Sequence, residues 1–308
     1  MDKQNKKRLN KYTNNLIKVC NRILVNREDK CQCYNYNNHP SKNIRECVNT
    51  KNSRKCRNYN KCKLIYNQFL SGSEPDYRPD KWADPIIEGS HNCYAYFLDD
   101  KIPYLKKKCL SICKKKHSNK KCRTNRDAVN NCGNLKPQPG NYADQFEIKK
   151  FTRNRKYTCP QMEKKIKIDS YKKKDKKKHL KSGSTIYGPV DFGEPCKKNY
   201  YKGGLTVDRG NTFHFYRQDS NGRFSHKQGT LKVENIDASD RPIYAPHLAD
   251  RDYKKQKSKG IVYNDWCGYY CLPRNYWLPT HAIGGNRHTK KNENTIHNSP
   301  GNFDNKLY

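Results

Sequence analysis

The chain has 308 residues, with 65 Lys+Arg against 29 Asp+Glu and only 33% hydrophobic residues. This apolar content allows one modest hydrophobic core and excludes two large ones. The net charge of +36 predicts a surface that attracts polyanions such as nucleic acid, an acidic partner or the inside of a capsid. No stretch approaches the roughly 18 consecutive apolar residues of a membrane span, so we expect none.

The start of the chain, MDKQNKKRLNKYTNN, is basic but lacks the apolar run of a signal peptide. The sequence therefore predicts an intracellular protein without a signal peptide. The 15 cysteines are many for that location, because clustered intracellular cysteines more often bind metal than form disulfides.

Residues 1–75 form a basic, cysteine-rich N-terminal extension with little apolar periodicity. Such a segment needs cross-links or a metal ion to hold a shape. A zinc site uses thiolates two to four residues apart, and only Cys31 and Cys33 come near this spacing. We therefore favour disulfides or free thiols for the cysteines of this segment, and a zinc site is the alternative hypothesis.

A folded domain is expected over residues 76–272, where aromatic residues and prolines become frequent. Ser90 is a good N-cap, and behind it Tyr94 and Phe97 recur at helical spacing. Cys93 then falls at the third helical position, where unpaired N–H groups favour the nucleophilic thiolate. The alternative is a small buried cysteine that packs a short helix.

A cysteine-rich insertion follows at residues 105–135. Two of its cysteines, Cys109 and Cys113, are four residues apart and would share a helix face that His117 extends. A structural zinc ion and a pair of disulfides both fit this pattern, and either would tie the four cysteines together. The four candidates are Cys109, Cys113, Cys122 and Cys132.

A second insertion, at residues 149–181, carries fifteen Lys or Arg against three acids. Such a run is most often a solvated loop. The other reading is a flexible anchor that neutralises phosphates of nucleic acid or another polyanion without reading sequence. The predicted polyanion-binding residues are Lys172, Lys173, Lys174, Lys176, Lys177 and Lys178.

The stretch FHFYRQDSNGRFSHKQG, from Phe213 to Gly229, predicts a β-hairpin around a Ser-Asn-Gly turn. A two-residue loop would place its two histidines, His214 and His226, on opposite faces. A three-residue loop, with a Gly in the left-handed region, pairs His226 with Tyr216 and places both histidines on one face. Residues 273–308 are expected to be a polar, disordered tail.

The order of these features resembles the NlpC-type cell-wall peptidases and the related CHAP amidases, both papain-like. The resemblance rests on a cysteine on a short helix, a Pro-Gly turn, and a strand that begins with histidine. A second histidine follows across a Gly-containing hairpin. The segments NCYAY, KPQPG and HFYRQDSNGRFSHKQG are also similar to uncharacterised proteins of giant DNA viruses and some bacteria. The resemblance covers roughly residues 76–272 and implies an α+β fold, a short N-terminal helix packed on an antiparallel sheet.

The resemblance implies a cysteine-dependent hydrolase of peptide or amide substrates that needs no cofactor for catalysis. Cys93 matches the nucleophile, His214 the general base and His226 the residue that orients the base. Tyr77 is the candidate oxyanion donor beside the backbone N–H of Cys93. The peptidases usually carry Asp-Cys-Ser before their helix, whereas this chain has Asn92, Cys93 and Tyr94.

The alternative function is a non-enzymatic basic protein, of a virion or associated with nucleic acid, built on an inactive hydrolase scaffold. The net charge favours it, because a peptidase has no need of +36. The resemblance and the Lys-, Asn-, Tyr- and Ile-rich usage indicate a viral origin, which would place the protein in host cytoplasm or in a virion. A zinc-dependent nucleic-acid module ranks last because repeated fingers are absent from the sequence.

Overall fold

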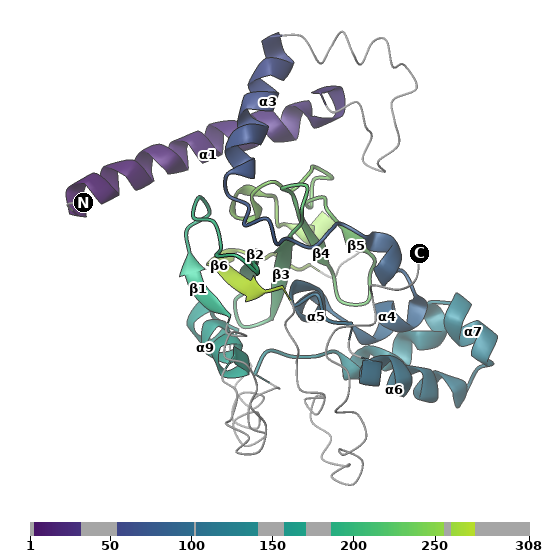
Figure 1. Ribbon diagram of the computed structural model, residues 1–308. Helices are drawn as coiled ribbons and strands as arrows, with labels where there is room; N and C mark the ends of the chain where they lie inside the picture. Colours follow the sequence, from purple (N-terminus) through teal and green to yellow (C-terminus); the bar gives the residue numbers. More distant parts are fainter. Residues whose placement is uncertain are drawn as a thin grey trace.

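The computed structural model describes residues 3–31, 54–101, 103–140, 157–170, 186–255 and 260–274. Helices surround one antiparallel sheet (Figure 1), so the expected α+β class is confirmed. The longer helices are α1 (Lys3–Cys31), α3 (Arg54–Asn67), α6 (Pro103–Lys114) and α9 (Cys159–Ser170). The shorter ones are α4 (Pro85–Ser90), α5 (Cys93–Phe97), α7 (Asn119–Thr124), η1 (Pro79–Trp82), η2 (Asp127–Leu135), η3 (Pro246–Leu248) and η4 (Tyr253–Lys255).

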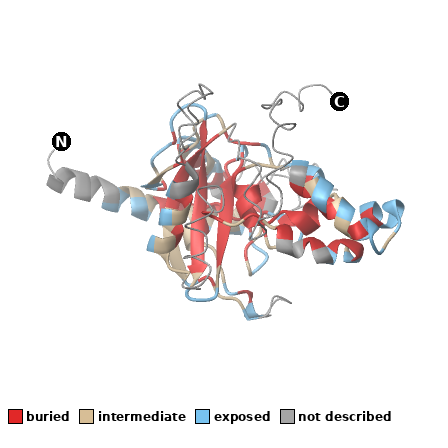
Figure 2. Ribbon diagram, turned by 90° about the horizontal axis from the view of Figure 1, so that it is seen from below, coloured by how far each residue is buried: buried red, intermediate tan, exposed pale blue. Residues whose placement is uncertain are grey.

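The six strands of this sheet run in the order β1-β6-β2-β3-β4-β5, and each paired neighbour is antiparallel. Their bounds are Tyr187–Val190, Tyr200–Asp208, Thr212–Gln218, Phe224–Lys227, Val233–Glu234 and Asp265–Pro273, for β1 to β6. The central strands β2 and β3 are buried along almost their whole length (Figure 2), because both faces of the sheet are covered.

The short helix α5 covers one face of the sheet. Its Phe97 ring packs on Phe215 of β3 at a centroid distance of 4.5 Å. A Cβ at Gly203 of β2 would lie 2.3 Å from that ring, so a glycine is required for α5 to approach the sheet this closely. The side chains of Phe97, Phe215 and Cys93 all belong to one buried cluster.

The opposite face is covered by α1 and α3, which pack against each other (Figure 1). Two disulfides staple them, Cys20–Cys62 and Cys31–Cys56. This basic segment was expected to need cross-links. Four of its six cysteines form them as disulfides. The zinc alternative involved Cys31, which is in a disulfide, and Cys33, which lies outside the described residues together with Cys47.

The cysteine-rich insertion folds as α6, α7 and η2 beside α4. Its four cysteines form two disulfides, Cys109–Cys132 and Cys113–Cys122. A disulfide sulfur offers no thiolate to a metal, so the zinc reading of these four residues is corrected. The described residues also contain no group of His, Cys, Asp or Glu that could hold a metal ion.

The Lys-rich insertion at 149–181 is not all loop. Residues Cys159–Ser170 form α9, which buries Met162 and Ile166 one helical turn apart. The disulfide Cys159–Cys267 fastens α9 to β6. The predicted polyanion-binding residues, Lys172 to Lys178, and the tail beyond Arg274 lie outside the described residues.

A sixth disulfide, Cys196–Cys271, joins the loop after β1 to β6. No described helix combines the length and apolar composition that crossing a membrane requires.

Candidate active site

Helix α5 begins at the thiol residue, Cys93, and Asn92 is its N-cap. The Asn92 side chain accepts hydrogen bonds from the backbone N–H groups of Tyr94 and Ala95, at 3.2 Å each. The expected cap, Ser90, is instead the last residue of α4, and its hydroxyl donates to the carbonyl of Ile86. Cys93 is therefore the first residue of its helix and not the third.

The Cys93 thiol is unpaired and 5% exposed. Among the cysteines that the structure describes, it is the one outside a disulfide. Burial raises its pKa to about 12, against the opposing effects of the backbone N–H of Phe215 and the charges of Lys227 and Lys136. The helix N-terminus does not offset the loss of water, so the resting thiol is protonated at neutral pH. The expected thiolate is thereby corrected.

The β3–β4 hairpin has the register that the three-residue loop predicts. His226 pairs with Tyr216, and the Asp219 N–H donates to the carbonyl of Arg223 at 2.9 Å. Gly222 closes the loop at φ +83°, in the region that favours glycine. The side chains of His214 and His226 consequently lie on the same face of the sheet.

The two histidines form a directed hydrogen-bond chain. His226 Nε2 lies 2.9 Å from the carbonyl oxygen of Ile236, which can only accept, so this nitrogen carries the hydrogen. In a neutral ring His226 Nδ1 is then an acceptor, and His214 Nε2 donates to it across 2.9 Å. The remaining nitrogen, His214 Nδ1, is left with its lone pair, as a general base requires.

Both imidazoles are neutral at rest. Burial, with the charge of His226 as a second cause, lowers the pKa of His214 well below its usual value. Burial likewise lowers the pKa of His226 to about 4, although its bond to Ile236 and the charge of Asp237 raise it. The site therefore holds a neutral thiol and two neutral rings, and no thiolate–imidazolium pair.

The pairing between β3 and β4 ends at Tyr216, one residue after Phe215, whose backbone contacts the thiol. Helix α5 lies on the face of Phe215, whereas His214 points to the other face. The β3–β4 register ends at the pair Tyr216 and His226, and on its other side β4 pairs with β5 through His226–Glu234 and Lys227–Val233. The Phe215 N–H donates to the Cys93 sulfur. The sulfur thus meets the sheet at the amide next to His214, although no described hydrogen bond joins the two side chains.

Tyrosine rings enclose the histidine pair. The Tyr263 ring stacks on His214 with centroids 5.0 Å apart and an interplanar angle of 24°, and the Tyr216 ring meets His214 edge-on at 5.1 Å. The charge of Cys93 contributes to the raised pKa of both tyrosines, after burial. The charge of Cys93 acts on both tyrosines, but it is not a cause of the lowered pKa of His214.

A buried lysine fixes the turn that carries the thiol. Lys227 Nζ donates to the carbonyls of Glu88, His91 and Gly229 at 3.0, 2.9 and 2.7 Å. Three acceptors match the three N–H groups of an ammonium ion. Burial lowers the pKa of Lys227 to about 7, and the charge of Glu88 opposes that shift. The ammonium ties β4 to the α4–α5 junction that precedes Cys93.

The candidate oxyanion donor, Tyr77, has a different set of neighbours. Burial raises its pKa to about 12, with the charges of Asp219 and Glu234 adding to the shift and Arg217 opposing it. It packs against the cluster that contains Trp82. These contacts associate Tyr77 with the Arg217 network, and its role as an oxyanion donor stays a prediction.

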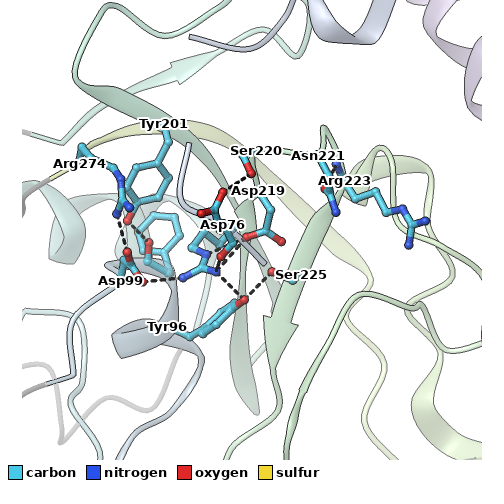
Figure 3. A network of polar contacts seen from close by, with 12 residues as sticks. Asp76, Tyr96, Asp99, Tyr201, Asp219, Ser220, Asn221, Arg223, Ser225 and Arg274 are labelled. Carbon is cyan, nitrogen blue, oxygen red and sulfur yellow. Dashed lines mark hydrogen bonds and ion pairs between the residues drawn. The ribbon is translucent and has the colours of Figure 1, made fainter. Parts of the chain in front are cut away.

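The Arg217 network lies on the α5 side of the same hairpin (Figure 3). Arg217 is 1% exposed and bonds to Asp219 and Asp99, the latter at 2.6 Å. The Tyr96 hydroxyl accepts from Arg217 at 2.8 Å and lies 2.6 Å from Ser225 Oγ. The network fastens α5 to β3 and β4.

Two residues of the site were not singled out from sequence, Lys227 and Tyr263. Lys227 follows His226 directly in a strand, so alternation placed it on the α5 face. A lysine is rarely fully buried, so the sequence gave no reason to expect its burial. The stacking of Tyr263 depends on a chain segment far from His214 in sequence, and no local pattern indicates it.

The comparisons with known proteins give one partial likeness. The chain is 40% identical over 72 residues to "Insoluble matrix shell protein 1" of Ruditapes philippinarum. The match spans 23% of this chain and 45% of that protein, which is less than half its length. No family model and no solved structure matches the chain.

Proposed function

We propose that the chain is a cysteine hydrolase with a papain-like, NlpC-type arrangement, acting on peptide or amide bonds. The observation that carries the proposal is the directed chain from Ile236 through His226 to His214. It sets the tautomer that leaves His214 Nδ1 unprotonated and able to accept a proton.

The arrangement supports a balanced acyl transfer. The Cys93 sulfur attacks the substrate carbonyl carbon while the thiol proton passes to His214 Nδ1, and His226 holds the imidazolium in place. In this proposal the backbone N–H of Cys93 donates to the oxyanion. The imidazolium then protonates the leaving amine as the C–N bond breaks, and a thioester remains. Water, deprotonated by His214, hydrolyses that thioester and releases the acid and the free thiol.

The neutral resting site sets a condition on this chemistry. Proton transfer from a thiol with a pKa of about 12 to a histidine whose pKa is well below 6.5 is unfavourable at rest. It becomes feasible as negative charge develops on the substrate oxygen and stabilises the imidazolium. Substrate must also displace the covering tyrosine rings. The enzyme is therefore expected to be slow toward small thiol reagents and faster toward substrates that bind.

The test is turnover of a broad mixture of peptide and amide substrates, followed by mass spectrometry. Cys93→Ala and His214→Ala should each abolish turnover, and His226→Ala should leave some, because an orienting residue contributes less than the base it holds. His117→Ala, in the turn between α6 and α7, is the matched control and should keep full activity. Turnover that survives Cys93→Ala, or no turnover of any substrate by the wild-type chain, would refute the hydrolase.

A second candidate is a non-enzymatic structural protein. It is favoured by the partial likeness to an insoluble matrix shell protein and by the dense cross-linking of the described residues. In that case Cys93→Ala would change stability alone, and the basic surface would carry the function.

We also propose that the chain folds in an oxidising compartment. The described residues alone form six disulfides, which are uncommon in the reducing interior of a cell, so this proposal stands against the intracellular location expected from the sequence. Peptide mapping of the native protein without reductant should return the six pairs. Recovery of these cysteines as free thiols would support the intracellular location.

A further inference from the structure

The α6–α7 insertion presents a dense group of exposed cations, here called the α6–α7 basic surface. Its members are all exposed, carry a positive charge and lie on the disulfide-stapled insertion. They are Lys107, Lys108, Lys114, Lys115, Lys116, Lys120, Lys121 and Arg123. The surface is distinct from the Lys172–Lys178 run, which lies outside the described residues.

This surface has no acidic residue of its own. The sequence from Lys101 to Arg126 contains no Asp or Glu. At the end of this stretch, Arg126 forms an ion pair with Glu88 at 2.9 Å. The described cations of the surface thus lack the interspersed carboxylates that usually balance a basic face.

The backbone beneath the charges is held covalently. The Cys113–Cys122 disulfide joins the end of α6 to α7 with Cα atoms 5.9 Å apart, and Cys109–Cys132 fastens α6 to η2. Five lysines lie inside the loop closed by the first bridge. Both bridges are buried in the main hydrophobic cluster. Like charges held together repel, and a polyanion that binds here relieves this repulsion without having to order the backbone.

We propose that the α6–α7 basic surface binds an acidic polysaccharide. The residues from Leu105 to Arg126 include no Phe, Tyr or Trp, so the surface has no ring on which nucleic-acid bases could stack. Seven of the eight cations are lysines, which act as point charges and do not require the two-pronged geometry of a phosphate–arginine contact. The disulfides that build the surface also persist where extracellular polysaccharides occur and nucleic acids are scarce.

The experiment measures binding of the full-length chain to heparin, as a sulfated polysaccharide, over a range of salt concentrations. The test variant replaces Lys114, Lys115, Lys116, Lys120 and Lys121 by Gln. The control variant removes the same charge from five exposed lysines elsewhere, and these are Lys11, Lys61, Lys198, Lys232 and Lys254. We expect heparin affinity to fall about tenfold or more in the test variant, with a shallower salt dependence, and to change about twofold or less in the control.

Two results would overturn the proposal. Equal loss of heparin affinity in both variants would mean that net charge alone drives binding and that the surface is not a site. Tighter binding to a short DNA duplex than to heparin, lost in the test variant, would make nucleic acid the partner. Activity of Cys93 does not enter either readout, so the result is independent of the proposed hydrolase. The substituted lysines are all exposed, and circular dichroism with disulfide mapping verifies that each variant is folded.

Discussion

The β3–β4 hairpin carries two buried polar groups of opposite character on its two faces. On the α5 face, Arg217 is a buried charge whose guanidinium bonds to Asp219, Asp99, the Tyr96 hydroxyl and the Asp76 carbonyl. On the other face, His214 and His226 are buried and neutral, and their chain of hydrogen bonds stops at one free lone pair.

The difference separates a structural network from a reactive one. The Arg217 guanidinium makes its bonds within the protein, so it has little left to offer a substrate. The histidine chain ends at His214 Nδ1, whose lone pair can accept a proton. The same few residues of sequence thus supply both the fastening of α5 and the acid–base chemistry that we propose.

Removing the buried charge should produce the largest effect. Arg217→Met leaves the carboxylate of Asp219 buried without its cation, which typically costs about 3–5 kcal/mol. The measurement is the free energy of unfolding in urea. Arg78→Met, which removes an exposed ion pair with Asp80, is the control and should leave the unfolding midpoint unchanged. Equal stability of Arg217→Met and the wild type would show that the network does not fasten α5.

The histidine face should respond to acid. The pKa of His226 is about 4 in the folded chain against roughly 6.5 when unfolded. The unfolded state therefore binds more protons as pH falls from about 6.5 to 4, and the stability present above 6.5 is lost across this window. His226→Gln should flatten the dependence by on the order of 2–3 kcal/mol. The measurement is urea unfolding at several pH values.

Asp219, on the opposite face of the hairpin, makes stability depend on pH in the opposite direction. Burial raises the pKa of Asp219 to about 6, so its share of the stability is present at low pH and is lost as pH rises toward 6. Asp219 is present in both the wild type and His226→Gln. Subtracting one curve of stability against pH from the other therefore removes the contribution of Asp219. Parallel pH curves for the wild type and His226→Gln would show that His226 is not buried as a neutral ring.

A smaller effect is expected at Lys227. Lys227→Met leaves the carbonyls of Glu88 and His91 without this donor, which should cost about 1–3 kcal/mol. The loss of its charge should also raise the pKa of the Cys93 thiol, because that charge lowers it. The rate of Cys93 alkylation against pH measures this shift. Lys232→Met, on the surface, should move neither quantity, and a Lys227→Met profile that coincides with wild type would rule out the positioning role.

The sequence predicted those features that depend on local chemistry. The hairpin itself follows from Ser220, Asn221 and Gly222, whereas the choice between a two-residue and a three-residue loop came from the structure, which pairs His226 with Tyr216. The start of α5 was misplaced because Ser90 and Asn92 are both good caps, and α4 uses the first as its last residue. The turn at Asp84 and Pro85, which begins α4, was the signal that could have separated the two helices.

Features that depend on distant contacts could not be read from the sequence. The disulfide Cys159–Cys267 spans 108 residues, and connectivity among 15 cysteines is not determined by spacing. Helix α9 could not be predicted within the basic run, because Met162 and Ile166 are too few apolar residues to give a helical pattern. The burial of Arg217 depends on partners from three separate segments, and an isolated charge in a strand indicates exposure.

The most direct test of the account is labelling of the native chain with a peptide-based electrophile at pH near 7, followed by intact mass. The account predicts one adduct, on Cys93, that disappears in Cys93→Ala and forms far more slowly in His214→Gln. Unfolding the chain with its disulfides intact should abolish the dependence of labelling on His214, because that dependence belongs to the assembled site. A native chain that stays unlabelled, or that labels equally fast with and without His214, would contradict the proposal that Cys93 and His214 work together.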